Sequence, residues 1–267
     1  TNRAWSAVTS GDLRDELQNS SGINMTDFFN TCIATPGFPH VSVDSFSVVP
    51  NGSDYDITVY TRERQKGNSQ TFTLQVDLTF SDVSTDTTVQ FTVNAPTNSF
   101  TVTLPFIPSW VSADRYAKLF SATIAFERTV TNNSTYTFPD VNASVQVIDT
   151  GSASSLIRIE HNYVKPDDFI SNPGGVRISD YRYYKVDGNF STGLLAKATF
   201  NYDGSTAVPN GCLDNTLITG SATEDSLLIF YRPGPGYNWQ LVNGYSINFQ
   251  VSHTDKRGLI TVDTLRR

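Results

Sequence analysis

The sequence has few of the residues that most often carry catalysis, metal binding or covalent cross-links. Its 267 residues include two cysteines and three histidines, and only 17% of them are charged. Two cysteines do not make a disulfide framework. The histidines at positions 40, 161 and 253 are too widely spaced to form a zinc-binding pair on one helix. There is no apolar run of about eighteen residues, so the sequence predicts no transmembrane segment.

Short catalytic motifs are missing as well. The sequence has no G-x-S-x-G nucleophile elbow, no G-x-x-x-x-G-K-[ST] phosphate loop and no G-x-G-x-x-G after a strand. Glu160 and His161 are adjacent, and adjacent side chains on a strand point to opposite faces. We therefore assign no catalytic, cofactor-binding or metal-binding residue in this chain from its sequence.

The charge balance also excludes a class of partner. The net charge is −7, and phosphate binding needs clustered lysine and arginine, so we expect no nucleic-acid partner. Serine, threonine and asparagine fill much of the sequence, which is typical of secreted or cell-surface β-proteins. Seventeen phenylalanines and twelve tyrosines are enough to form cores. Because the sequence starts at Thr1 without methionine or a signal peptide, we expect a processed or excised piece of a longer protein.

Helical signals are confined to the first forty residues. Ser10 and Asp12 begin one helix, and Ser21-Gly22 ends it. Asn24 can cap a second helix that starts at Met25. Thr35-Pro36 stops that helix, because the residue before proline is disfavoured in the α region. We interpret residues 1–39 as a helical hairpin, the remnant of a larger helical domain, because its apolar face is too small to form a core alone.

After this hairpin the pattern is that of β-strands. Val41–Val49 and Tyr55–Thr61 flank the turn at 50–53, and alternation is clearest over 72–80. Residues 114–128 are ambiguous between helix and strand. The polar segment Thr129–Thr135 is the best candidate linker. The predicted fold is all-β, with two consecutive antiparallel sandwich-like domains at 40–133 and 134–267 after the hairpin.

Three groups of residues have both a functional and a structural interpretation. Carboxylates at 54 and 56, 167–168 and 224–225 can bind calcium, but acidic residues are also common in solvated turns. Cys32 is either a buried thiol or bridged to Cys212. Aromatic residues suit a core, a domain interface or a ligand-binding face that stacks on sugars. They form two groups, Tyr181, Tyr183, Tyr184 and Phe190, and Tyr237, Trp239 and Tyr245.

The segment DLRDELQNSSGINMTDFFNTCIATPGFPHVSV resembles the end of the catalytic domain of M1-family zinc aminopeptidases, where an SG-x-D-L-x-x-F-F-x-x-W helix and an x-x-x-G-x-P turn lead into a β-sandwich. Ser21-Gly22, Phe28-Phe29 and Gly37-Phe38-Pro39 match, whereas Cys32 replaces the usual tryptophan. The runs NYVKPDDF, SDYRYYKVDGNF, TEDSLLIFYRP and GLITVDTLRR are similar to the extra β-domain of secreted Bacteroidetes members. The H-E-x-x-H zinc signature is absent here, so no catalytic residue carries over.

This resemblance implies a function for the region rather than for a site. We expect the non-catalytic C-terminal part of a secreted M1-like metallopeptidase, with zinc and catalysis in an upstream domain of the same polypeptide. The alternative is a secreted or cell-surface binding or structural module, for a glycan or a protein, without enzymatic activity. The chain ends within a strand pattern, TVDTLRR, so we expect it to continue.

Overall fold

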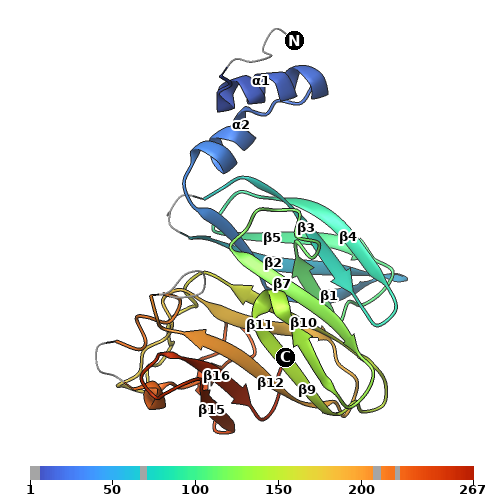
Figure 1. Ribbon diagram of the computed structural model, residues 1–267. Coiled ribbons are helices and arrows are strands. Elements are labelled where there is room, and N and C mark those ends of the chain that lie inside the picture. Colours follow the sequence, from blue (N-terminus) through green and yellow to red (C-terminus); the bar gives the residue numbers. More distant parts are fainter. Residues whose placement is uncertain (1–6, 67–70, 207–211, 220–222) are drawn as a thin grey trace.

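A computed structural model describes residues 7–66, 71–206, 212–219 and 223–267. It shows an all-β body of antiparallel sheets with a short helical extension at the N-terminal end (Figure 1). The predicted fold class is confirmed. Among the described residues, no helix combines the length and apolar character that crossing a membrane requires.

The helical extension forms as its capping residues dictate. Helix α1 (Ser10–Ser21) begins with a capping box between Thr9 and Asp12. It ends at Gly22, whose φ of 71° is the left-handed conformation that glycine adopts at low cost. Helix α2 (Thr26–Phe28) follows and continues as one π-helical turn (Phe29–Ala34). The helix begins one residue later than predicted, with Met25 at its N-cap position, although the side chain of Asn24 accepts a hydrogen bond from the amide of Thr26.

The first sandwich consists of two three-stranded sheets. Their orders are β1-β2-β5 and β4-β3-β6, and the predicted hairpin is the β1–β2 pair. Strand β3 covers the predicted alternating segment. The two sheets pack face to face on one core, to which β2 contributes Ile57 and Val59 and β3 contributes Val76 and Leu78. The strands are β1 (Phe38–Asn51), β2 (Asp54–Lys66), β3 (Leu74–Ser81), β4 (Asp86–Val93), β5 (Thr97–Leu104) and β6 (Trp110–Ala113).

The second sandwich packs the sheet β11-β10-β7 against the sheet β15-β16-β12-β9-β8. Ile157 and Ile159 of one sheet share a core with Val145, Ala198 and Val262 of the other. A two-stranded ribbon, β13-β14, lies beside it. The strands are β7 (Thr123–Val130), β8 (Thr135–Phe138), β9 (Ala143–Asp149), β10 (Ser155–Asn162), β11 (Tyr183–Asn189), β12 (Leu195–Asp203), β13 (Phe230–Tyr231), β14 (Gln240–Leu241), β15 (Tyr245–Phe249) and β16 (Arg257–Val262); short 3-10 turns occupy Pro139–Val141 and Glu224–Ser226.

The crossing between the sandwiches lies upstream of the predicted boundary at 133/134. Strand β7 pairs along its whole length with β10, so it belongs to the second sandwich. The segment Thr129–Thr135, predicted as a linker, instead ends β7, turns and begins β8. Residues 114–122 make the crossing as turns, with positive φ at Asp114 and Ala117, and the helical alternative for 114–128 is wrong.

Candidate functional site

The two sandwiches meet along a polar seam that is largely buried, although its charged side chains are 9–30% exposed. Seven side chains form it, and they come from β1, β2, β10, β11 and the two loops that follow β10 and β13. Such groups are expensive to bury unless they are hydrogen-bonded to one another. We define the seam as His40, Arg62, Arg64, Asn162, Asp167, Tyr183 and Arg232.

Asp167 is the centre of the seam. Its Oδ1 accepts hydrogen bonds from Arg62 at 2.7 Å and Arg64 at 2.5 Å, and its Oδ2 accepts one from Arg232 at 2.6 Å. The indole of Trp239 donates to its backbone oxygen at 2.8 Å. Burial raises the pKa of this carboxyl, but the bond from Arg232 and the charge of Arg64 outweigh burial and lower the pKa below its usual range. Asp167 therefore ties the first sandwich to two loops of the second.

His40 occupies the buried end of the seam. Its Nε2 lies 2.9 Å from Oδ1 of Asn162 and 3.3 Å from the hydroxyl of Tyr183, which also accepts a hydrogen bond from Arg64. Burial, together with the positive charge of Arg64, lowers the pKa of His40 to about 4. The imidazole is therefore neutral at physiological pH and serves as a hydrogen-bonding group within the interface.

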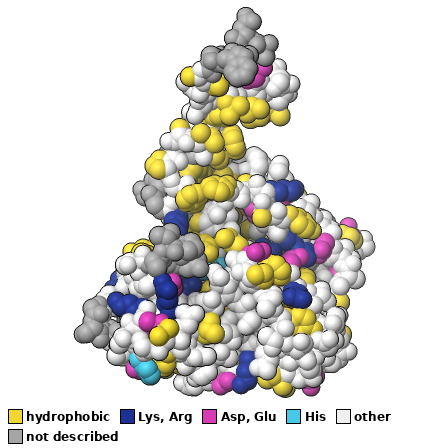
Figure 2. All heavy atoms as spheres, in the orientation of Figure 1, with side chains coloured by type: hydrophobic (Ala, Val, Ile, Leu, Met, Phe, Trp, Pro, Cys, Tyr) yellow, Lys and Arg dark blue, Asp and Glu magenta, His cyan; other side chains and the backbone are white. Residues whose placement is uncertain are grey.

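A second polar cluster lies farther along the same junction. Arg115, in the crossing segment, donates to Asp86 of β4 and to Glu127 of β7. Arg158 of β10 pairs with Glu127 and with Glu160. Both arginine side chains are less than a tenth exposed. Acidic and basic side chains alternate across this junction on the face seen in Figure 2. The junction thus holds the two sandwiches together by charge pairs as well as by packing.

His161 is buried inside the second sandwich. Its ring stacks between Tyr163 and Tyr184, and its Nε2 lies 3.4 Å from Nη1 of Arg182. Burial and the charge of Arg182 lower its pKa to about 3. The third histidine, His253, is exposed and pairs with Asp225 at 2.9 Å. The three histidines thus have different surroundings and different partners.

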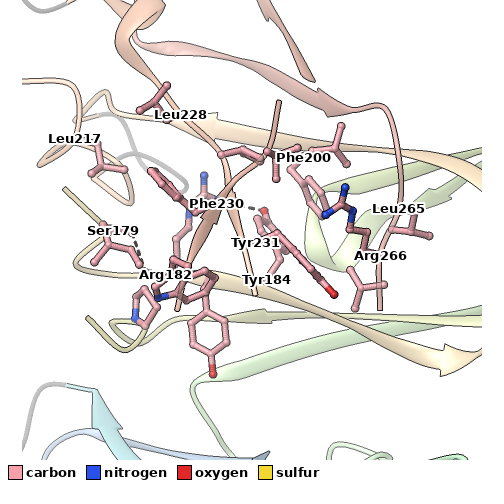
Figure 3. A pocket seen from close by; sticks show the side chains of 18 of the residues that line it. Ser179, Arg182, Tyr184, Phe200, Leu217, Leu228, Phe230, Tyr231, Leu265 and Arg266 are labelled. Atoms are coloured by element: carbon pink, nitrogen blue, oxygen red, sulfur yellow. Dashed lines mark hydrogen bonds between the residues drawn. The ribbon is translucent and has the colours of Figure 1, made fainter. Parts of the chain in front are cut away.

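Beside the seam, the second sandwich is hollowed. Two adjoining hollows of about 250 Å³ and 490 Å³ share the aromatic side chains of Tyr183, Tyr184, Phe230, Tyr231 and Trp239. Apolar side chains from β11, β12, β13 and β16 line the smaller hollow. Arginine side chains lie at the edges of both. Figure 3 shows the rings gathered between two leucines on one side and Leu265 with Arg266 on the other.

The helical extension exposes apolar side chains. Helix α1 buries none of its residues, and its Leu13 is 54% exposed. Phe28 is 53% exposed, whereas its neighbour Phe29 is 6% exposed and belongs to the buried set. Apolar side chains cover much of the narrow connection between the extension and the β body (Figure 2). The exposed apolar side chains of the extension are Val8, Leu13, Leu17, Ile23, Phe28 and Ile33.

The carboxylates considered for calcium have protein partners instead. Asp167 is engaged by three arginines. Glu224 is fully buried and accepts hydrogen bonds from the hydroxyl of Tyr202 and the amide of Lys256. Asp56 accepts from Asn51 and Thr103. Within the described ranges, no group of three or more His, Cys, Asp or Glu side chains is placed to hold a metal ion.

The cysteine interpretation requires a correction. Cys32 and Cys212 are both free and exposed, so neither the buried thiol nor the bridge is present. The apolar stripe that predicts burial of Cys32 lies on the extension, where Phe29 is buried but Phe28, Cys32 and Ile33 are left exposed by the rest of the described chain.

The two aromatic groups contain both buried and exposed side chains. Tyr183 and Tyr184 are largely buried, as a core or domain interface requires, whereas Tyr181 and Tyr237 are exposed, as a ligand-binding face requires.

Sequence reasoning missed the seam. The sequence pattern presents Asp167 as a calcium ligand or a solvated turn residue, and neither alternative anticipates its three arginine partners. A usable signal was present in the strand pattern, because Arg62 and Arg64 lie on one face of a strand whose other face includes the buried Ile57 and Val59. Two arginines on one face of a half-buried strand indicate an anionic partner nearby.

Comparisons with known proteins leave the chain without an assigned family. No protein-family model, no curated protein and no solved structure matches it.

Proposed function

We propose that this chain is the non-catalytic C-terminal β-region of a secreted, M1-like zinc metallopeptidase, and that it supports the catalytic domain of the same polypeptide. Zinc and its ligands would lie in that upstream domain, since this sequence has no H-E-x-x-H signature. Water activation by the metal would take place there and would involve no residue of this chain. The role of the region is mechanical and spatial: it would position the catalytic domain and limit access to it.

The observation that carries the proposal is the uncovered apolar side of the helical extension. A twelve-residue helix without buried side chains is marginal by itself in water. Contiguous exposed apolar side chains mark an interaction surface. A helical catalytic domain directly upstream would cover Leu13, Leu17 and Phe28 and so stabilise the extension.

The positions that carry the family resemblance have structural roles that suit this proposal. Gly22 ends α1 in the left-handed conformation, and Gly37 has a φ of 110° at the turn into β1. Phe29 is buried, and Phe38 and Pro39 begin the strand that enters the body. A motif made of turn and core residues is what a domain junction requires, whereas an active site would require reactive groups.

The contacts between the two sandwiches are a second observation in favour of a scaffold role. A support transmits position only if its own parts are fixed relative to each other. Asp167, His40 and the Arg115 cluster join the sandwiches at separate points along the junction. Rotation between the sandwiches would separate these charge pairs and leave partly buried charges without a partner, which is unfavourable.

The first test is the intact mass of the native protein, combined with zinc analysis of the same sample. The proposal expects a mass well above 29.4 kDa, about one zinc per chain and hydrolysis of peptide substrates. A native mass near 29.4 kDa without zinc would contradict it, as would a larger protein that hydrolyses no peptide with zinc present.

A second test addresses the docking surface in the same native protein. Phe28→Asp should lower the melting temperature of the catalytic domain, because it places a charge in the proposed interface. Ile107→Asp is the matched control, since Ile107 is also 53% exposed but lies on the first sandwich. Equal effects of the two substitutions would contradict docking through the extension.

One observation favours the second candidate, a binding module for a glycan or a protein. The hollow beside β11 gathers aromatic side chains with hydrogen-bonding groups, which is a usual composition for a ligand site. A module that binds through this hollow would bind its ligand equally well with residues 1–34 removed, whereas the scaffold role requires those residues.

A further inference from the structure

The smaller hollow is an apolar chamber in the second sandwich. It is bounded by β11, β12, β13 and the segment that follows β16 (Figure 3). Its wall includes Tyr184, Phe200 and Phe230, together with Val242 and Leu265. Its volume of about 250 Å³ is close to the ~300 Å³ at which ligand pockets begin. It is large enough for a small apolar chain or ring.

The cationic side chains that line the two hollows differ in whether they have a carboxylate partner. Six cationic side chains that line the two hollows each have a carboxylate partner. They are Arg64 and Arg232 with Asp167, Arg177 with Asp180, Arg182 with Asp214, and Lys185 and Arg267 with Asp187. These partners fix the side chains and largely neutralise them, so an incoming anion would have to compete with a carboxylate that is already in place.

Arg266 differs from the other six. Among the described residues it has no carboxylate partner, and its guanidinium lies 5.2 Å from the centre of the Tyr231 ring. It lines both hollows. A guanidinium held over an aromatic ring keeps all its donors available for a planar carboxylate. The chamber thus has one uncompensated positive charge, among the described residues, beside a mostly apolar wall.

We propose that this chamber binds a small monocarboxylate with an apolar tail, the tail lying among Tyr184, Phe200 and Leu265 and the carboxylate on Arg266. The chemistry follows from the two halves of the site. The apolar wall gains free energy by displacing water from a hydrocarbon tail. The guanidinium gains a charge-assisted, bidentate hydrogen bond. This inference concerns the second sandwich alone and stands whether or not a catalytic domain lies upstream.

The net charge of the protein makes the expected ligand preference more specific. At −7 the protein as a whole repels anions, so a small anion is not concentrated on it non-specifically. Acetate, which has the charge without the tail, should therefore not bind measurably. Octanol, which has the tail without the charge, should bind more weakly than octanoate.

The test is calorimetric titration of the purified protein with octanoate, octanol and acetate. Arg266→Gln should weaken octanoate binding about tenfold or more, the loss expected for one charge-assisted contact, and leave octanol unchanged. Arg128→Gln is the matched control, because Arg128 also lies 5.2 Å over a tyrosine ring, that of Tyr136, on a different part of the surface. It should leave both affinities unchanged.

A second pair of variants tests the chamber itself. Leu228 lines the hollow and is 42% exposed, so Leu228→Trp should fill part of the space without disturbing the core and should abolish binding of both probes. Leu241→Trp is the control, because Leu241 is similarly exposed and lines neither hollow. Circular dichroism and melting of each variant show that the fold is retained.

The outcomes separate clearly. Equal octanoate affinity in the wild-type protein and the Arg266→Gln variant overturns the role of Arg266. Binding that Leu228→Trp leaves intact, or no octanoate binding to the wild-type protein at millimolar concentration, overturns the site. Replacing octanoate by N-acetylphenylalanine distinguishes two sources of the same chemistry: tighter binding of this probe indicates the carboxyl end of a peptide, and tighter binding of octanoate indicates a free fatty acid.

Discussion

The helical extension and the seam reverse the usual distribution of residue types in opposite ways. The extension leaves leucine and phenylalanine side chains exposed to solvent, whereas the seam buries arginine, aspartate and histidine. The seam is satisfied in its charges, because each charged side chain has a partner within hydrogen-bonding distance, whereas Nδ1 of His40 and Nδ2 of Asn162 have no partner among the described residues. The extension is not satisfied in this sense, because its apolar side chains have no cover in the described chain. One region forms an interface within the chain, and the other leaves apolar side chains exposed.

The largest effect is expected from acidification, which should destabilise the buried polar groups of the body and leave the exposed extension unaffected. His40 and His161 are buried in the neutral form, and their pKa values are lowered from 6.5 to about 4 and about 3. Between pH 6.5 and about 4 the unfolded chain therefore binds protons that the folded chain does not. The free energy of unfolding should fall as the pH falls through this window, by roughly 3 kcal/mol for each histidine. Urea unfolding across this range measures the loss.

Two substitutions test whether these histidines cause the loss of stability at low pH. His40→Gln keeps a donor toward Asn162, and His161→Phe keeps the stacking on Tyr163 and Tyr184. The double variant should show a nearly flat stability in the same window, whereas His253→Gln, at an exposed site, should behave like the wild-type protein. An unchanged slope in the double variant would contradict the assignment.

The next largest effect is expected at Asp167. Asp167→Asn leaves Arg62, Arg64 and Arg232 facing one another without a counter-charge, so it should destabilise the folded protein by about 3 kcal/mol. Asp168→Asn is the adjacent control. Its side chain is 76% exposed and, among the described residues, pairs only with Lys165, so the change should stay within about 0.5 kcal/mol. Similar losses for the two variants would remove Asp167 from the centre of the seam.

Asp167 also predicts a pH dependence at lower pH. Because its pKa is lowered below 3.8 in the folded state, its contribution is present above that value and is lost as the pH falls through the folded-state pKa. The wild-type protein should therefore lose stability below pH 3.8 more steeply than the Asp167→Asn variant. Parallel curves for the two proteins would show that the arginines do not hold this carboxyl in its charged form.

A smaller effect is expected on the exposed side of the extension. Leu13→Asp or Phe28→Asp in the chain alone should change the free energy of unfolding by less than about 0.5 kcal/mol, since both side chains are already more than half exposed. The corresponding measurement is urea unfolding of the body. A loss of several kcal/mol would show that the extension is already packed and needs no cover.

The smallest effect is expected from removing residues 1–34. The two sandwiches hold their own cores, so the trimmed protein should melt cooperatively at an unchanged temperature. Calorimetry makes this measurement. Loss of a cooperative transition would make the extension part of the body and end the distinction between the two regions.

Much of this fold is readable from local pattern. The β3 strand follows from strict alternation, and the β1–β2 hairpin follows from its Pro-Asn-Gly-Ser turn. The end of α1 at Gly22 and the extended backbone of Thr35 before Pro36 follow from single-residue preferences. In each case the information lies within a few residues of the feature.

The candidate sites depend on contacts that local pattern cannot reveal. His40 and Asn162 are 122 residues apart, and Arg62 and Asp167 are 105 apart. Alternation indicates which face of a strand is buried, but it does not indicate which distant charge will meet it. Cys32 shows the converse limit, because its apolar stripe predicts burial and yet the described chain provides nothing to cover it.

The first residues of β1 have a mechanical consequence. The backbone oxygen of Pro39 accepts a hydrogen bond from Ala122, whose own oxygen accepts one from Tyr163, and the next side chain, His40, reaches Asn162. The strand that leaves the extension is therefore fastened to both sandwiches within two residues of its start. A force applied to the helices would therefore act on both sandwiches together, and the body would rotate as one rigid unit. Bending would occur in the turn at residues 35–37.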